Sequence, residues 1–405
     1  MNLEDKLPPI GKFKDVVVVP LINPATGERQ ENGPIWPDWD SQQSARFCRG
    51  GSPVDKRPDN PAQIDVYVDG PLIWGGSIHP HFGHFIAEYA SRILQSQKCY
   101  GDVPFLFGCS NRPLARAGTI DKAPAHFLPT VRWLGLNSEQ IRFCTQNMKI
   151  STLLVASQAE QLVALRRKRH DLTLSSEYLD LLDQNVLRNN LLSVPNKLVF
   201  VSRAKLAPHL DRYAGSVYLD ELLKSLGAFV FYPERHTLTE QLAVYAGAEN
   251  LIFAEGSAIH GLQLLGRGLG AVTILNRRKG TLVAEYNLRP RCKELQYFDI
   301  MANVFAMSSL DKLPHMHCNM ATFDLDCLFA AFLNSGIDLS KNWDAVKYQI
   351  AVKEDMKSWV VASGASLKKR GRDIGEQTEL LELLKSSGHK NVHRFAEKFI
   401  KENLV

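Results

Sequence analysis

The chain has 405 residues, of which 45% are hydrophobic and 22% are charged. This composition is typical of a globular protein with two or three domains, and it excludes long disordered stretches. The formal net charge of +5 suits an anionic ligand such as a sugar nucleotide. Neither of the two densest basic runs, at residues 166–170 and 368–372, carries interleaved aromatic residues. We therefore expect no nucleic-acid partner.

The cysteines and the apolar segments indicate the compartment. There are seven cysteines, an odd number, with irregular spacing and no Cys-x-x-Cys pair, which predicts a reducing environment. The first residues form no apolar signal core, and no apolar run reaches the roughly 20 residues needed to cross a bilayer. We expect a cytoplasmic protein whose only membrane contact is peripheral, at the inner face.

The first half of the chain predicts an α/β domain behind an irregular extension. Residues 1–62 are rich in Pro, Gly and polar residues, with one strand-like run at 16–19. From residue 63 the hydrophobic pattern alternates between the two kinds of element. We expect strands at residues 64–68, 103–107, 141–144 and 152–156, and helices at 81–97, 125–136 and 158–192. The Ser193–Asn196 segment marks a domain boundary, so that this domain covers residues 63–194.

The second half has the clearer alternation. We expect strands at residues 198–201, 229–231, 251–254 and 272–275, and helices at 219–226, 237–247 and 257–265. Thr237 and Glu240 stand at capping-box spacing where the second of these helices begins. Four strands that alternate with three helices predict a parallel sheet with right-handed crossovers, over residues 195–300. Residues 301–405 are expected to be mostly helical, with helices at 343–361 and 376–404.

The strand ends of this second domain predict an anion site. Ligands of an open parallel sheet bind beyond the carboxyl ends of its strands, and the candidate residues near these ends are Ser202, Arg203, Arg212, Glu234, Glu255, Gly256, Ser257 and His260. Arginine holds phosphate oxygens bidentately. The Gly256–Ser257 turn lets a phosphate approach the backbone, and Ser257 is expected to cap the helix that follows.

Each of these candidates also has a structural interpretation. Ser257 can be a plain helix cap, and Arg203 and Arg212 can be surface arginines. Glu255 would repel a phosphate, so we expect it to bind ribose hydroxyls or to pair with Arg203. His260 either contacts a phosphate or a sugar hydroxyl, or makes a structural hydrogen bond.

A histidine-rich block at residues 75–88 predicts a second site. His79, His81 and His84 lie within six residues, and His84 and Glu88 are spaced to share a helix face. A carboxylate fixes the tautomer of a histidine and raises its basicity, as a general base requires. His79 and His81 would then lie on the acceptor side. Two alternatives remain open, a metal site on the three histidines and a solvated polar helix face.

The order of these motifs resembles glycosyltransferase family 61, including its bacterial capsule and surface-polysaccharide members. The resemblance rests on residues 81–88, 200–203, 232–234, 240–241 and 253–260, and it covers about residues 71–278. It implies a GT-B-like architecture of two Rossmann-like α/β domains that face a cleft, inversion at the anomeric carbon and no divalent metal or other cofactor. No Asp-x-Asp motif lies where the donor is expected to bind, and this agrees with a reaction that needs no divalent metal. Many relatives have His-Gly-Ala where this chain has Glu255-Gly256-Ser257, so donor choice cannot be transferred.

These observations predict an inverting, metal-independent glycosyltransferase of surface polysaccharide synthesis. Its partners would be a nucleotide-sugar donor and a glycan, glycolipid or glycoprotein acceptor, and the oligomeric state is open. His84, oriented by Glu88, would deprotonate the acceptor hydroxyl. The alternative functions are a polysaccharide pyruvyl transferase, a metal-dependent hydrolase that uses His79, His81 and His84, and a non-catalytic glycan-binding subunit.

Overall fold

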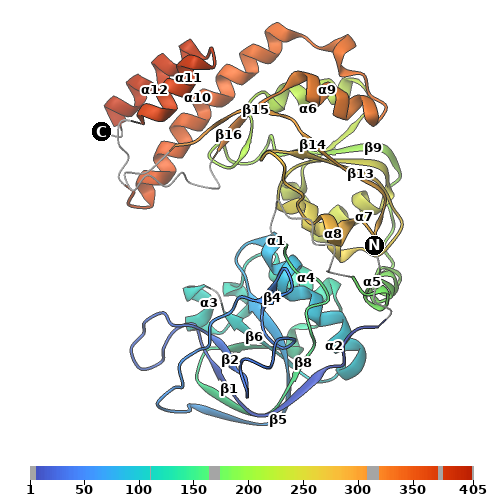
Figure 1. Cartoon of the computed structure of the whole chain (residues 1–405), viewed down its shortest axis with the longest axis vertical. Helices are drawn as coiled ribbons and strands as arrows, with labels where there is room; N and C mark the ends of the chain where they lie inside the picture. Colours follow the sequence, from blue (N-terminus) through green and yellow to red (C-terminus); the bar gives the residue numbers. More distant parts are fainter. Residues whose placement is uncertain (1–5, 110, 164–173, 308–318, 373–376, 404–405) are drawn as a thin grey trace.

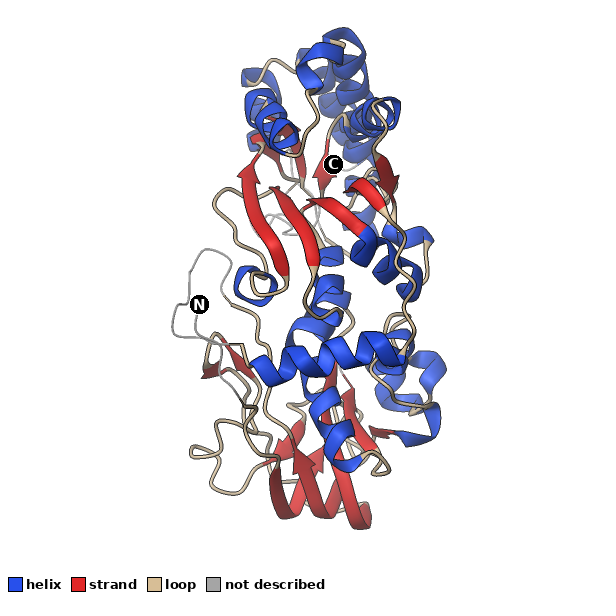
Figure 2. Cartoon of the chain, turned by 90° about the vertical axis from the view of Figure 1, so that its right-hand side faces the viewer, coloured by secondary structure: helices blue, strands red, loops and turns tan. Residues whose placement is uncertain are grey.

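The two largest sheets lie apart along the long axis of the molecule, with helices between them (Figure 1). The computed structural model describes residues 6–109, 111–163, 174–307, 319–372 and 377–403. The six-stranded sheet, formed by the first half of the chain, lies at one end of the molecule, and the five-stranded sheet lies beyond a layer of helices (Figure 2). Further helices cover the outer face of the second sheet. The basic run at 166–170 lies outside the described residues.

The first sheet has six strands in the order β2-β1-β8-β5-β6-β7. Its strands are β1 (Gly11–Val19), β2 (Gly33–Ile35), β5 (Val66–Ile78), β6 (Phe105–Cys109), β7 (Ile141–Cys144) and β8 (Met148–Val155), and β3 (Cys48–Arg49) pairs separately with β4 (Ser52–Pro53). Strands β8, β5, β6 and β7 run parallel, whereas β1 is antiparallel to β2 and β8. The segment expected to be irregular therefore contributes β1 and β2, because Val16 and Val18 alternate into the core beneath it.

The helices of the first half differ from the prediction in type and length. They are α1 (Phe82–His84), η1 (Phe85–Tyr89), η2 (Ala90–Arg92), α2 (Ile93–Tyr100), α3 (Arg112–Ala117), η3 (Ile120–Lys122), α4 (Phe127–Trp133), η4 (Ser138–Gln140) and α5 (Ser176–Arg188). The expected helix at 81–97 is a continuous helical run with one π-helical segment, η1. Of the helix expected at 158–192, the structure shows α5 over Ser176–Arg188, and residues 164–173 lie outside the described part of the chain. Residues 158–163 are not helical, and there the Gln158 amide bonds to the backbone of Cys48 and Glu88 instead.

The second sheet is entirely parallel, as predicted, with the order β11-β9-β12-β13-β14. Its strands are β9 (Asn196–Val201), β11 (Phe229–Phe231), β12 (Ala248–Ala254), β13 (Leu269–Asn276) and β14 (Cys292–Asp299). The central strands are apolar runs because both of their faces are covered. The sequence interpretation missed β14, whose partly exposed residues give no such run.

Helices cover both faces of this sheet. The inner face carries α7 (Leu238–Gly247), η6 (Ser257–Leu264) and α8 (Glu285–Leu288), and the outer face carries α6 (Ser216–Ser225), α9 (Leu325–Asn334) and α10 (Ala345–Lys369). The capping box of α7 is confirmed, with Thr237 N donating to Glu240 Oε2 at 2.7 Å and Glu240 N donating to Thr237 Oγ1 at 3.3 Å. Element η6 is a 3-10 helix rather than the expected α-helix.

The C-terminal region is mostly helical, as predicted. It also contains β15 (Met301–Phe305), β16 (Met320–Phe323), η7 (Leu339–Asn342), α11 (Thr378–Ser386) and α12 (Lys390–Asn403). Strands β15 and β16 form a three-stranded sheet with β10 (Arg212–Tyr213), which lies earlier in the chain, as does η5 (Pro233–Arg235) before α7. The single helix expected at 376–404 is divided by Gly388, whose positive φ of 85° ends α11. None of the described helices combines the length and the apolar character that a membrane crossing requires.

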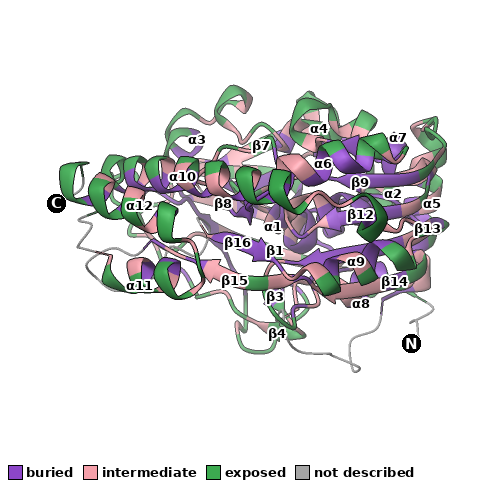
Figure 3. Ribbon diagram, turned by 90° about the horizontal axis from the view of Figure 1, so that it is seen from above, coloured by how far each residue is buried: buried purple, intermediate pink, exposed green. Residues whose placement is uncertain are grey.

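The hydrophobic core joins the two halves. One cluster contains Ile73 and Phe107 of the first sheet together with Val199 and Phe253 of the second, so it continues through the helical layer between them. Two other clusters lie on the outer faces of the two sheets. Viewed from above, strands β9, β12 and β13 are mostly buried, whereas the outer helices α10 and α12 are largely exposed on one side (Figure 3). The two halves are therefore held in a defined relative position.

Candidate functional site

A cavity of about 420 Å³ lies between the two halves of the molecule. The first half contributes α1 and the beginning of α4, through Phe82, His126 and Thr130. The second half contributes the segments that follow strands β9, β11 and β12, and the lining residues there include Ser202, Arg203, Glu234, Gln241, Ser257 and Ala258. Four of the eight residues predicted as a donor site line this wall: Ser202, Arg203, Glu234 and Ser257. The size suits a small organic ligand.

The strand order explains why the cavity lies at this place. The chain leaves β9 for the edge strand β11 and then returns to β12 on the other side of β9. Such a reversal leaves an open crevice beyond the carboxyl ends of the two central strands, where ligands of α/β sheets bind. Ser202 and Arg203 follow β9, and Gly256 and Ser257 follow β12. The fold therefore brings these two predicted pairs together.

Arg203 is the cationic group of this wall. Its Nε donates to the backbone oxygen of Asp211 at 3.0 Å, and within the described residues it forms no ion pair. Burial, and then the neighbouring charge of Arg277, lower the pKa of Arg203. A side chain on Gly256 would overlap the Arg203 guanidinium. Glycine at 256 thus allows a charged group without an acidic partner to lie across the strand end, where an anion would stabilise it.

Ser257 does not have the capping role that we expected. It is the first residue of η6 rather than the residue before it, and no side chain caps this helix. Ser257 and Ala258 instead line the cavity. The beginning of η6 therefore faces the space where a ligand would lie.

Two predicted donor residues are engaged elsewhere. Glu255 is fully buried, and it accepts hydrogen bonds from the Arg277 amide and the Arg278 guanidinium rather than from Arg203. Arg212 is also buried, and it pairs with Asp355 of α10 at 2.9 Å. Glu255 and Arg212 thus form structural contacts within the second half of the molecule. Neither residue lines the cavity between the halves.

Ser202 connects the cavity to a buried carboxylate. Its hydroxyl donates to Asp220 Oδ2 at 2.9 Å, and Tyr232 donates to the same oxygen at 2.9 Å. Burial raises the pKa of Asp220 to about 6 in spite of these two hydrogen bonds. Oδ1 of Asp220 is buried and has no partner among the described residues. The folded protein therefore keeps the proton of this carboxyl up to a higher pH than the unfolded chain does.

We expect the Asp220→Asn variant to lose part of the pH dependence of stability. Between pH 4 and 6 the folded protein keeps a proton on Asp220 that the unfolded chain, with an ordinary pKa of 3.8, has released. The free energy of unfolding of the wild type therefore falls as the pH rises through this window, by up to about 3 kcal/mol. Urea denaturation at pH 4.5 and pH 7 measures the difference. The exposed control Asp59→Asn should keep the wild-type fall, and an unchanged fall in Asp220→Asn would contradict the assignment.

The three histidines of residues 79–84 lie together at the beginning of α1. The ring centroids of His79 and His84 are 4.6 Å apart, and those of His81 and His84 are 5.3 Å apart. Burial, and then the charge of His84, lower the pKa of His79. Across the part of the chain that the structure describes, no group of three or more His, Cys, Asp or Glu side chains is arranged to hold a metal ion.

The predicted hydrogen bond between His84 and Glu88 is present, at 2.9 Å between Nδ1 and Oε2. Glu88 is fully buried on η1, whereas the His84 side chain is about one-third exposed. With Nδ1 held by the carboxylate, Nε2 is the nitrogen that can accept a proton from a substrate hydroxyl. None of His79, His81 and His84 is among the residues that line the cavity between the halves.

Arg49 is a partner of this pair that the sequence analysis missed. Its guanidinium binds both carboxylate oxygens of Glu88, with a distance of 3.2 Å from Nη2 to Oε2. Burial raises the pKa of Glu88, but the hydrogen bonds from His84 and Arg49 outweigh it, so that this pKa lies below its ordinary value. No local sequence signal could have identified Arg49, because it reaches Glu88 from β3, 39 residues away.

Close packing of α1 on η6 joins the two groups of candidates. A Cβ on Gly83 would lie 2.5 Å from Cδ2 of His260, so only glycine lets the two helices approach this closely. His260 is buried, and its Nδ1 lies 2.6 Å from Gln263 Oε1. His260 thus has the structural role that the sequence analysis gave as an alternative, because it packs between the two halves. It does not line the cavity. The same contact places His84 beside the helix that begins at Ser257.

His126 is a second residue that the sequence analysis missed. It lines the cavity from the beginning of α4, and its Nε2 lies 3.2 Å from the backbone oxygen of His79. Burial lowers the pKa of His126, which favours the neutral ring at pH 7. Its ring also packs against Phe82, with centroids 5.8 Å apart. A lone histidine at a helix start gave no reason to select it.

The comparisons with known proteins agree with this arrangement. Residues 82–272 match the family model Glycosyltransferase 61, and this stretch begins at α1 and ends in β13, so it includes both walls of the cavity. No curated protein matches the chain. The predicted resemblance to this family is confirmed. The chain therefore carries a Glycosyltransferase 61 domain and is a glycosyl-transferring enzyme.

Proposed function

We propose that this enzyme transfers a sugar from a nucleotide-sugar donor to a glycan hydroxyl, with inversion, in a GT-B-like arrangement. The observation that carries the proposal is the cavity between the halves, which has Arg203 and Ser257 on one wall and α1, the helix of His84, on the other. The two sheets lie on opposite sides of this cavity (Figure 1). A donor bound to one half would thus meet an acceptor bound to the other.

The reaction that we propose is a single displacement. His84 Nε2 takes the proton of the acceptor hydroxyl while that oxygen forms a bond to the anomeric carbon. The bond from the same carbon to the nucleoside diphosphate breaks on the opposite face, and the diphosphate leaves with the electron pair. Inversion follows from this geometry. Arg203 and the backbone amides at the beginning of η6 would bind the departing diphosphate.

Metal independence is part of the proposal. The support is Arg203, a positive charge at the strand end that forms no ion pair among the described residues, although the charges of Asp211, Glu255 and Glu234 act on it. Such a charge compensates the developing negative charge of a diphosphate, as a divalent cation does in other transferases. The resemblance to family 61 implies the same.

We expect Arg203→Ala to weaken nucleotide binding. The charge-assisted hydrogen bonds that Arg203 would make to a diphosphate contribute enough for about a 10- to 100-fold loss of affinity. Thermal unfolding with UDP, GDP and CMP, each with and without EDTA, identifies the nucleotide and measures the loss.

The control for this experiment is Arg289→Ala, because Arg289 is a half-exposed arginine that pairs only with Glu285 on its own helix. Affinity that stays unchanged in Arg203→Ala would remove Arg203 from the donor site. Nucleotide protection that EDTA abolishes would overturn metal independence, and no protection by any nucleotide would favour a pyruvyl transferase or a glycan-binding subunit.

We further propose that the acceptor belongs to a surface polysaccharide and that transfer occurs in the cytoplasm or at the inner face of the membrane. The six cysteines that the structure describes are free thiols, which supports a reducing compartment. The family resemblance supports the polysaccharide role. Detection of the product on a lipid-linked or a free glycan would distinguish the two kinds of acceptor.

A further inference from the structure

A second cavity, of about 280 Å³, lies in the first half of the molecule, and five of the residues that line it are aromatic. Three of the six tryptophans of the chain line it, together with a phenylalanine and a tyrosine: Trp36, Trp39, Trp74, Phe47 and Tyr89. Trp36 and Trp74 are buried in the wall, whereas Trp39, Phe47 and Tyr89 are partly exposed. Three aromatic side chains of the cavity wall are therefore partly accessible to a ligand.

Polar groups stand between these rings. Asp55, Asn32 and Arg92 line the same cavity. Arg46 pairs with Asp55 at 2.9 Å, and its guanidinium lies over the Trp39 ring at 4.4 Å. Aromatic faces together with fixed hydrogen-bonding groups are the combination that a pyranose needs, because its ring has an apolar C–H face and a rim of hydroxyls.

The cavity is connected to the proposed base by direct contacts. Phe47 and Tyr89 stack in its wall, with centroids 4.8 Å apart and an interplanar angle of 13°. Tyr89 follows Glu88 in η1, and the Arg49 guanidinium lies 5.3 Å from the centre of the Phe47 ring while it binds Glu88. The Phe47–Tyr89 stack thus stands between the cavity and the His84–Glu88 pair. A sugar in the cavity would lie near the reacting hydroxyl without carrying it.

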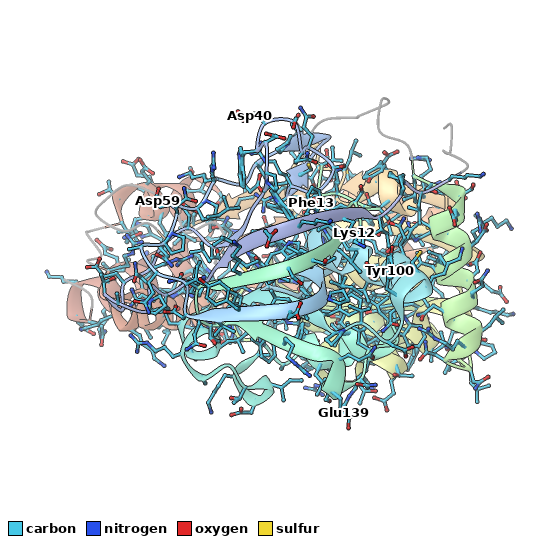
Figure 4. All side chains as sticks on the ribbon, turned by 90° about the horizontal axis from the view of Figure 1, so that it is seen from below. Lys12, Phe13, Asp40, Asp59, Tyr100 and Glu139 are labelled. Carbon is cyan, nitrogen blue, oxygen red and sulfur yellow. The ribbon has the colours of Figure 1, made fainter. Side chains whose placement is uncertain are left out.

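Most of this cavity lies outside the part of the chain that matches the family. The match begins at residue 82, whereas the cavity is lined mainly by residues 31–58 and by the end of β5. Asp40 lies within residues 31–58, and Asp59 follows them. Figure 4 shows both on the side of the first sheet where β1 carries Phe13, away from Glu139 near β7. The cavity is therefore a feature that this N-terminal segment adds to the transferase domain.

We propose that this aromatic cavity binds one sugar unit of the acceptor glycan, separate from the unit that is glycosylated. The identification of the ligand as the acceptor rests on the proposed function, whereas the binding of a sugar does not. The N-terminal segment then determines which glycan the enzyme accepts.

Saturation-transfer-difference NMR with a panel of methyl pyranosides tests the proposal directly. We expect at least one glycoside to receive saturation on the protons of one ring face. Trp39→Ala should weaken its binding about tenfold, whereas Trp39→Phe should retain most of it, because the aromatic face remains. Tyr67→Ala is the control, since Tyr67 is an exposed aromatic residue of the same sheet that does not line the cavity.

The outcomes separate this proposal from the proposed function. The sugar site is overturned if Trp39→Ala leaves every glycoside signal unchanged or if no glycoside gives a signal. This holds even when nucleotide protection through Arg203 is observed. It is also overturned if UDP, GDP or CMP gives the Trp39-dependent signal, because the cavity would then be a nucleotide site. A Trp39-dependent glycoside signal without any nucleotide binding would support the sugar site and would contradict the transfer of sugar from a nucleotide donor.

Discussion

His84→Ala should reduce the rate of glycosyl transfer by about 10²- to 10⁴-fold, which is the range that a general base contributes. The cause is loss of the imidazole that Glu88 orients through the 2.9 Å hydrogen bond. The measurement is turnover with the sugar nucleotide identified by the thermal-shift panel. Nucleotide affinity should remain near the wild-type value, because His84 lies on the half of the molecule opposite to Arg203.

Two further variants make this result specific. Glu88→Gln should lower turnover less than His84→Ala and should shift the pH profile of the rate, because the imidazole loses its carboxylate partner. His393→Ala, in the remote helix α12, is the matched histidine control and should behave as the wild type. Normal turnover in His84→Ala would remove His84 from the mechanism.

Glu160→Gln should lower the free energy of unfolding by about 3–5 kcal/mol, since it leaves a buried guanidinium without a counter-charge. Glu160 follows the first sheet and pairs with Arg291, which precedes β14, at 2.7 Å, and both side chains are at most 1% exposed. Gln263 of η6 also donates to Glu160, at 3.1 Å. The pair therefore links the two halves behind the cavity. Urea denaturation measures the loss.

The double variant Glu160→Leu/Arg291→Met distinguishes a lost pair from lost packing. Apolar side chains of similar size remove both charges together, so most of the lost stability should return. The exposed pair of Arg267 and Asp180 provides the control, because Arg267→Ala should cost no more than about 1 kcal/mol. If Glu160→Gln keeps the wild-type free energy of unfolding, the charges of Glu160 and Arg291 do not stabilise each other in the folded protein.

The sequence alone determined the elements whose signals are local. The apolar runs of β9, β12 and β13 predict buried parallel strands, and Thr237 with Glu240 predicts the beginning of α7. The spacing of His84 and Glu88 on one helix predicts their hydrogen bond, because residues four apart share a face. The rule that ligands bind at strand ends then selected Arg203 and Ser257, both of which line the cavity.

Only the tertiary structure decided the long-range partners. Arg49 reaches Glu88 across 39 residues, Arg212 reaches Asp355 across 143, and no periodicity in the sequence records either contact. Strands β2 and β14 depend on the neighbours with which they pair. The segment around Gln158 is not helical, and the Gln158 side chain contacts Cys48 and Glu88 instead. The physical reason is the same in each case. A hydrogen-bonding or charged side chain is satisfied by whichever partner folding brings near, and that choice depends on the packing of the whole chain rather than on its neighbours in sequence.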